Sequence, residues 1–139
     1  MISRVLLCTS AAIMLFLGSV HLAYTAFTHK FGPTDGRLET AMKGTAMRIS
    51  DQTTVWNAWI GFHFSHSLSL ILFGLVYGYL ITCRWEVLQR SYFLSGLGLL
   101  ALMAYVVLSR MFWFRTPFLG VLAATLLYMA GFVWLYARN

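Results

Sequence analysis

Four long apolar runs constrain the fold of this chain more than any other feature. A helix of about 20 apolar residues crosses a hydrocarbon layer about 30 Å thick, and each run is close to that length. Alternation with a period of two residues is absent, which argues against strands. The sequence therefore predicts an all-α fold, an integral membrane bundle of four transmembrane helices that forms a single domain over residues 1–139. The approximate spans are residues 5–27, 56–82, 92–110 and 116–137.

Composition supports a lipid environment. Hydrophobic residues make up 60% of the chain and charged residues 10%, whereas a soluble domain carries about 25% charged residues. The formal net charge is +6, but the basic residues lie singly between apolar runs and form no stripe. This pattern favours membrane lipids as partners and argues against nucleic acid. The first run is longer than the roughly 7–15 residues of a signal-peptide core, so we interpret it as a span.

Residues 28–55 form the only long connection, and the membrane face on which they lie is called the loop face. The segment GPTDG has turn composition. Leu38, Met42 and Ile49 then recur at helical spacing among charged residues, which predicts a short amphipathic helix between spans one and two. Ser50 or Asp51 is expected to cap the second span. Four spans place both termini on one side of the membrane, but basic residues are nearly balanced between the faces, so orientation stays open.

Two histidines three residues apart interrupt the second span, and a third lies in the first. His63 follows Trp56 by seven residues and His21 lies about six residues before the end of its span, so a rise of about 1.5 Å per residue places both at similar depth. His66 lies one turn deeper. Polar groups at such depth are costly unless they have partners or a function. The residues predicted to converge as a ligand-binding pocket near the loop face are His21, Tyr24, Asn57, His63, His66, Arg110 and Arg115.

Three chemistries fit these residue types. A lipid-like or quinone-like ligand would place its head near the arginines and His21 and its tail between helices. Haem b would take axial ligands from His21 and from His63 or His66. The same three imidazoles are the only candidates for a zinc or copper site. The first chemistry requires the fewest assumptions and is preferred, and we assign no metal site.

A rival class is a non-catalytic accessory subunit of a larger membrane complex, in which the same polar groups only pack helices together. The sequence contains no triad or activated Cys/His pair, so no catalytic residue is predicted and enzymatic activity is left open. A small transporter is less favoured. Cation exporters of this size rely on an intramembrane carboxylate, whereas the four acidic residues lie outside the spans, and basic residues at the loop face repel cations. They are Asp35, Glu39, Asp51 and Glu86.

Small residues four apart allow close helix approach. Gly74 with Gly78, and Gly120 with Ala124, are therefore expected to set helix register or to dock other membrane subunits or a second copy. Cys8 and Cys83 belong to no CxxC motif, and two reduced apolar thiols are favoured over a disulfide between them, which is left open.

The segments GSVHLAYTAF and WNAWIGFHFSHSLSLILFGLVYGYL resemble those of small uncharacterised bacterial membrane proteins with four spans. The resemblance covers spans one and two and the start of the connection between them. It implies four helices in a bacterial cytoplasmic (inner) membrane. It implies no activity and no residue roles.

Overall fold

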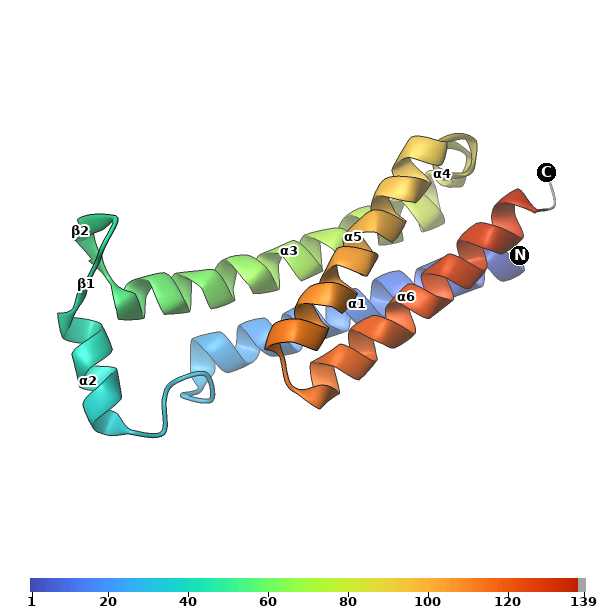
Figure 1. Cartoon of the computed structure of the whole chain (residues 1–139). Coiled ribbons are helices and arrows are strands. Elements are labelled where there is room, and N and C mark those ends of the chain that lie inside the picture. Colours follow the sequence, from blue (N-terminus) through green and yellow to red (C-terminus); the bar gives the residue numbers. More distant parts are fainter. Residues whose placement is uncertain (138–139) are drawn as a thin grey trace. The chain divides into compact units, whose positions relative to one another are not determined.

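The computed structural model describes residues 1–137 and contains four long helices (Figure 1). Each is long and apolar enough to cross a membrane. This confirms the predicted all-α fold with four spans, and the chain is accordingly an integral membrane protein. The long helices are α1 (Ile2–Phe27), α3 (Val55–Cys83), α5 (Tyr92–Phe112) and α6 (Arg115–Tyr136). The shorter elements are α2 (Gly36–Gly44), the strands β1 (Ala46–Met47) and β2 (Ser50–Thr54), and α4 (Trp85–Arg90).

The connection between α1 and α3 contains the predicted short helix and, in addition, a hairpin that the sequence pattern did not predict. Helix α2 begins after Asp35, whose carboxylate accepts a hydrogen bond from the Arg37 backbone N–H at 2.8 Å. It ends at Gly44 because glycine is a poor helix former. Strands β1 and β2 then pair antiparallel. Ile49 therefore lies in the hairpin turn and not on the helix, which corrects the expected helical spacing.

The start of α3 also differs from the expected cap. Residues 50–54 are in strand β2, so Ser50 and Asp51 lie before the helix and cannot cap it. The hydroxyl of Thr54 instead accepts a hydrogen bond from the Asn57 backbone N–H at 3.2 Å. Thr54 thus satisfies one of the backbone donors that a helix start leaves free.

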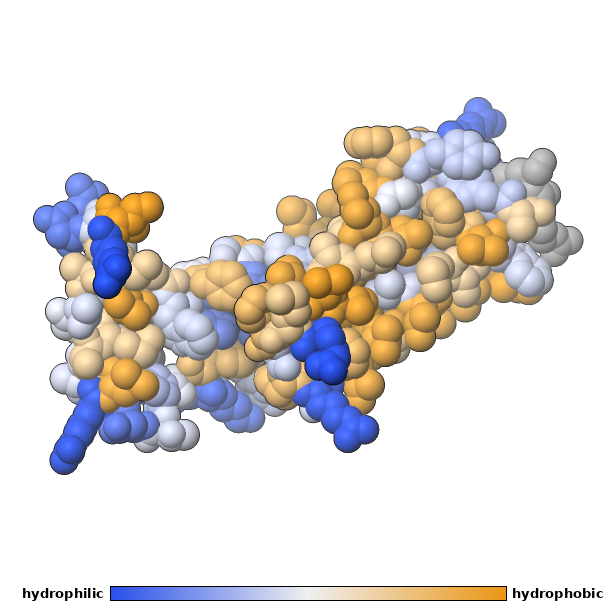
Figure 2. Space-filling model, viewed as in Figure 1, coloured by the Kyte–Doolittle hydropathy of each residue, from blue (hydrophilic) through white to orange (hydrophobic). Residues whose placement is uncertain are grey.

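The structure divides into two compact units, one of residues 1–17 and 70–137 and the other of residues 18–69. In the first unit, the N-terminal part of α1 and the C-terminal part of α3 pack with α4, α5 and α6 around an apolar core. Helices α5 and α6 lie side by side (Figure 1). Hydrophobic residues also make up most of the visible faces of these two helices, apart from a hydrophilic patch where α5 ends and α6 begins (Figure 2), as a surface in contact with lipid requires. Core residues with almost no exposed surface include Leu7, Met14, Ile81, Leu102 and Tyr128.

Small residues bring the helices of this unit close together. A Cβ atom added at Gly74 would lie 2.8 Å from the carbonyl oxygen of Ala11, so α3 meets the backbone of α1 there. On α6, the carbonyl of Ala124 accepts a hydrogen bond from the Ser10 hydroxyl at 2.7 Å. Gly78, in contrast, has nothing within 4 Å of its added Cβ. Of the two small residues expected to act together on α3, only Gly74 lies where a side chain would collide with another helix.

Candidate site: a histidine–aromatic cluster

The second unit contains a group of rings from three chain segments, which we call the histidine–aromatic cluster. Its members are His21, Phe31, Trp59, His63 and His66. His21 comes from α1, and Phe31 comes from the connection. Trp59, His63 and His66 come from α3, where spacings of four and three residues place them on one face of the helix. Helix α1, the connection after it and helix α3 thus contribute to one cluster.

Two of the histidines contact each other directly. The Nε2 atom of His21 lies 3.0 Å from Nδ1 of His63, which is hydrogen-bond distance. The two rings are nearly parallel, with an interplanar angle of 25° and centroids 5.2 Å apart. The His66 ring meets His21 edge-on at 78°, also with centroids 5.2 Å apart. In this contact one nitrogen donates its hydrogen and the other accepts it, so the ring that accepts carries its own hydrogen on its other nitrogen when both rings are neutral.

Phe31 covers the histidine pair. Its ring stacks on His21 with a centroid distance of 4.3 Å and on His63 with 4.6 Å. Its backbone is held in place because the indole N–H of Trp59 donates to the Phe31 carbonyl at 2.8 Å. The Trp59 ring in turn meets His63 edge-on at 4.6 Å. The pair therefore lies in an apolar aromatic surrounding, where hydrogen bonds are stronger than in water.

One nitrogen of this cluster is buried without a partner. His63 is only 8% exposed, and its Nδ1 faces His21. Its Nε2 has no hydrogen-bond partner within residues 1–137. Leaving a buried polar atom unpaired costs about 1–3 kcal/mol, and such atoms are rare in native structures. A ligand group that donates or accepts one hydrogen bond would satisfy this nitrogen.

The other predicted pocket residues have different surroundings. In the second unit, the Lys30 ammonium lies over the Tyr24 ring, 3.9 Å from its centroid. Asn57, also in this unit, is exposed at the start of α3. Arg110 and Arg115 belong to the first unit, at the end of α5 and the start of α6, and both are exposed. The ligand roles of these four residues stay predictions.

Sequence reasoning did not include Phe31 or Trp59 among the candidate site residues. Phe31 lies in a turn closed by a hydrogen bond from the Gly32 N–H to the His29 carbonyl at 3.0 Å. Helical periodicity in the sequence does not predict a contact between residue 31 and residues 59–63. The only signal is an aromatic residue directly before the turn segment GPTDG.

The geometry bears on the three chemistries considered. Two axial histidines must each direct a nitrogen at one metal ion, whereas the facing nitrogens of His21 and His63 are hydrogen-bonded to each other. In the part of the chain that the structure describes, no three His, Cys, Asp or Glu side chains are grouped to hold a metal ion. The facing nitrogens of His21 and His63 are therefore not arranged as a pair of axial ligands to one ion.

Comparisons with known proteins add no family to this description. No protein-family model, curated protein or solved structure matches the chain.

Proposed function

We propose that this integral membrane protein binds a lipophilic ligand of the quinone class. One carbonyl or hydroxyl oxygen of the quinone head lies at Nε2 of His63. The single observation that carries the proposal is that this nitrogen is buried and has no partner within residues 1–137. The surrounding rings of Phe31 and Trp59 suit a planar aromatic head, because such rings stack favourably on one another. The apolar surface of the spans would receive the isoprenoid tail.

The histidine pair supports this ligand class in both of its oxidation states. When Nε2 of His21 donates its proton to Nδ1 of His63, the outer Nε2 of His63 carries a hydrogen and donates to a quinone carbonyl. When Nδ1 of His63 donates to His21 instead, Nε2 of His63 has a lone pair and accepts from a quinol hydroxyl. The second arrangement differs from the first by a hydrogen lost from Nε2 of His63 and a hydrogen gained on Nδ1 of His21, while the 3.0 Å contact is kept. With both rings neutral, the same nitrogen can thus serve either form of the ligand.

Access to this nitrogen requires a ring to turn aside, because His63 is buried. Trp59 is 42% exposed and Phe62, which lies beside His63 and His66, is 58% exposed. Side chains with this much free space change rotamer readily. Trp59 and Phe62 are therefore the rings we expect to move when the ligand enters.

Removing the nitrogen tests the proposal. We expect His63→Leu to weaken binding of a short-chain ubiquinone analogue by about two- to tenfold, since one net hydrogen bond contributes about 0.5–1.5 kcal/mol. Binding is measured in mild detergent by quenching of tryptophan fluorescence, because the indole of Trp59 lies against His63. His29→Leu is the matched control, since it removes an imidazole from the connection outside the cluster, and its affinity should equal that of the wild type.

The accessory-subunit alternative is favoured by a different observation. Phe31, His21 and His63 already contact one another directly, as a cluster that only packs segments together would. Under that alternative, His63→Leu changes the melting temperature or the assembly of the protein, and the quinone analogue binds the wild type and His63→Leu equally weakly. Equal affinity of the two proteins would therefore reject the quinone proposal.

A further inference from the structure

The connection between α1 and α3 has two arginines next to exposed aliphatic side chains. Arg37 precedes Leu38 on α2, and Arg48 precedes Ile49 at the hairpin turn. Leu38 is 51% exposed and Ile49 is 89% exposed. Both arginines are exposed as well. The same pairing of a guanidinium with a protruding aliphatic group thus occurs on two separate elements.

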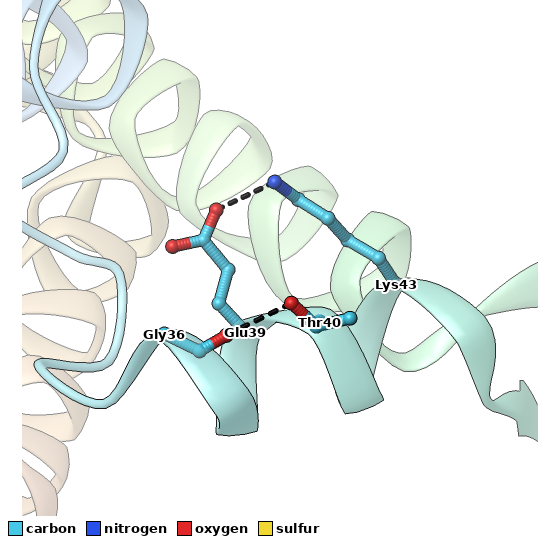
Figure 3. Close-up of polar contacts among 4 residues, drawn as sticks. All are labelled: Gly36, Glu39, Thr40 and Lys43. Carbon is cyan, nitrogen blue, oxygen red and sulfur yellow. Dashed lines mark hydrogen bonds and ion pairs between the residues drawn. The ribbon is translucent and has the colours of Figure 1, made fainter.

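No hydrogen bond or ion pair engages either guanidinium within residues 1–137, and the two acids beside Arg37 are engaged elsewhere. The carboxylate of Asp35 accepts from the backbone N–H of Arg37. Glu39 is paired with Lys43, four residues further along α2 (Figure 3). The hydrogen bond from Lys43 holds the pKa of Glu39 below its usual value, so this carboxylate stays ionised and bound to Lys43. The charges of Arg37 and Arg48 therefore remain available to an external anion.

Chain connectivity keeps these groups close to the membrane surface. Strand β2 ends at Thr54, and the span α3 begins at the next residue. The C-terminal turn of α2 is attached there too, because the Lys43 ammonium lies 4.8 Å from the Trp56 ring centroid. Tryptophan at the end of a span is typical of the membrane–water interface. Figure 2 shows hydrophilic and hydrophobic residues side by side on α2 and the hairpin.

From these observations we infer that α2 and the β1–β2 hairpin form a clamp for anionic phospholipid. Leu38 and Ile49 enter the outer part of the acyl layer, and Arg37 and Arg48 bind the phosphate groups above it. An arginine beside an inserted aliphatic residue keeps its charge at headgroup level in this way. The clamp is independent of the quinone proposal, because it uses no residue of the histidine–aromatic cluster.

The test compares headgroup selectivity of variants of the full chain in lipid nanodiscs. Spin-labelled phosphatidylglycerol and phosphatidylcholine report the relative association of an anionic and a zwitterionic lipid with the protein. We expect the wild type to prefer phosphatidylglycerol and each of Arg37→Gln and Arg48→Gln to reduce that preference about fivefold, the effect of one basic residue at a charged bilayer. Lys30→Gln is the matched control. It removes the same charge from the same connection, but Lys30 lies over the Tyr24 ring, so the preference should be retained.

A second measurement tests insertion without relying on charge. A fluorescent NBD group is attached to Ile49→Cys in a background with Cys8→Ala and Cys83→Ala. We expect NBD emission to be blue-shifted and protected from iodide in nanodiscs that contain phosphatidylglycerol, and much less so in pure phosphatidylcholine. Equal iodide quenching in the two lipids, or an unchanged lipid preference in the Arg37→Gln/Arg48→Gln double variant, overturns the clamp.

Discussion

Gly74→Ala lowers the free energy of unfolding by about 3 kcal/mol, whereas Gly78→Ala, one helical turn away on α3, leaves it unchanged or raises it. The added methyl group at position 74 would lie 2.6 Å from Cβ of Leu15 and 2.8 Å from the backbone of α1. Backbone atoms of a packed helix cannot move aside singly, so α1 and α3 must separate. Overpacking of this kind costs typically 1–3 kcal/mol, and we expect the upper end of that range.

Gly78→Ala is the matched control for this prediction. Its added Cβ has nothing within 4 Å, and alanine is the better helix former by at most about 1 kcal/mol. Both free energies are obtained from reversible SDS titration in mixed micelles. Equal stability of the two variants would contradict the close approach of α1 and α3 at Gly74.

Gly98→Ala is expected to lower the free energy of unfolding by about 2 kcal/mol, for a different reason. A Cβ atom at Gly98 would overlap the Tyr128 hydroxyl and lie 2.6 Å from the Tyr77 ring. Both rings are buried and hold hydrogen bonds. Tyr128 donates to the Ser95 carbonyl at 3.1 Å, and Tyr77 donates to the Leu94 carbonyl at 2.9 Å. Moving either ring therefore adds a lost hydrogen bond to the steric cost.

The comparison for Gly98 is Gly96, on the same helix α5. An added Cβ at Gly96 meets nothing within 4 Å, so Gly96→Ala should be neutral or slightly stabilising in the same SDS titration. The two tyrosines also provide an internal check, since the near-ultraviolet circular dichroism of buried tyrosine should change in Gly98→Ala alone. Retention of wild-type stability by Gly98→Ala would contradict the close approach of Tyr77 and Tyr128 to Gly98.

These glycines show where sequence reasoning succeeds and where it ends. Gly74 and Gly78 were predicted together as a packing pair because they share a face of one helix. Two helices that cross approach most closely at one level, and the level is decided by the partner, here Ala11 and Leu15 of α1. The spans themselves were predictable, because length and hydropathy define each one without reference to its neighbours.

The same distinction applies to the candidate site. Counting residues from the ends of the spans placed His21 and His63 at similar depth, but it gave no helix adjacency, and the 3.0 Å contact comes from the structure. The position of Phe31 in the cluster could not be predicted, because it depends on a turn and on the hydrogen bond that Trp59 donates to the Phe31 carbonyl. The hairpin was also missed, since its nine residues are mostly polar and were read as a continuation of an amphipathic helix.

Photoaffinity labelling with an azido-quinone tests the central claim, that His63 binds a quinone head, most directly. The purified protein is irradiated with the probe in mild detergent and the adducts are located by mass spectrometry. We predict adducts within residues 59–66 and at or next to Phe31, suppressed by an excess of unlabelled quinone and strongly reduced in His63→Leu. Adducts spread over the exposed faces of α5 and α6, unaffected by competitor and by His63→Leu, would contradict it.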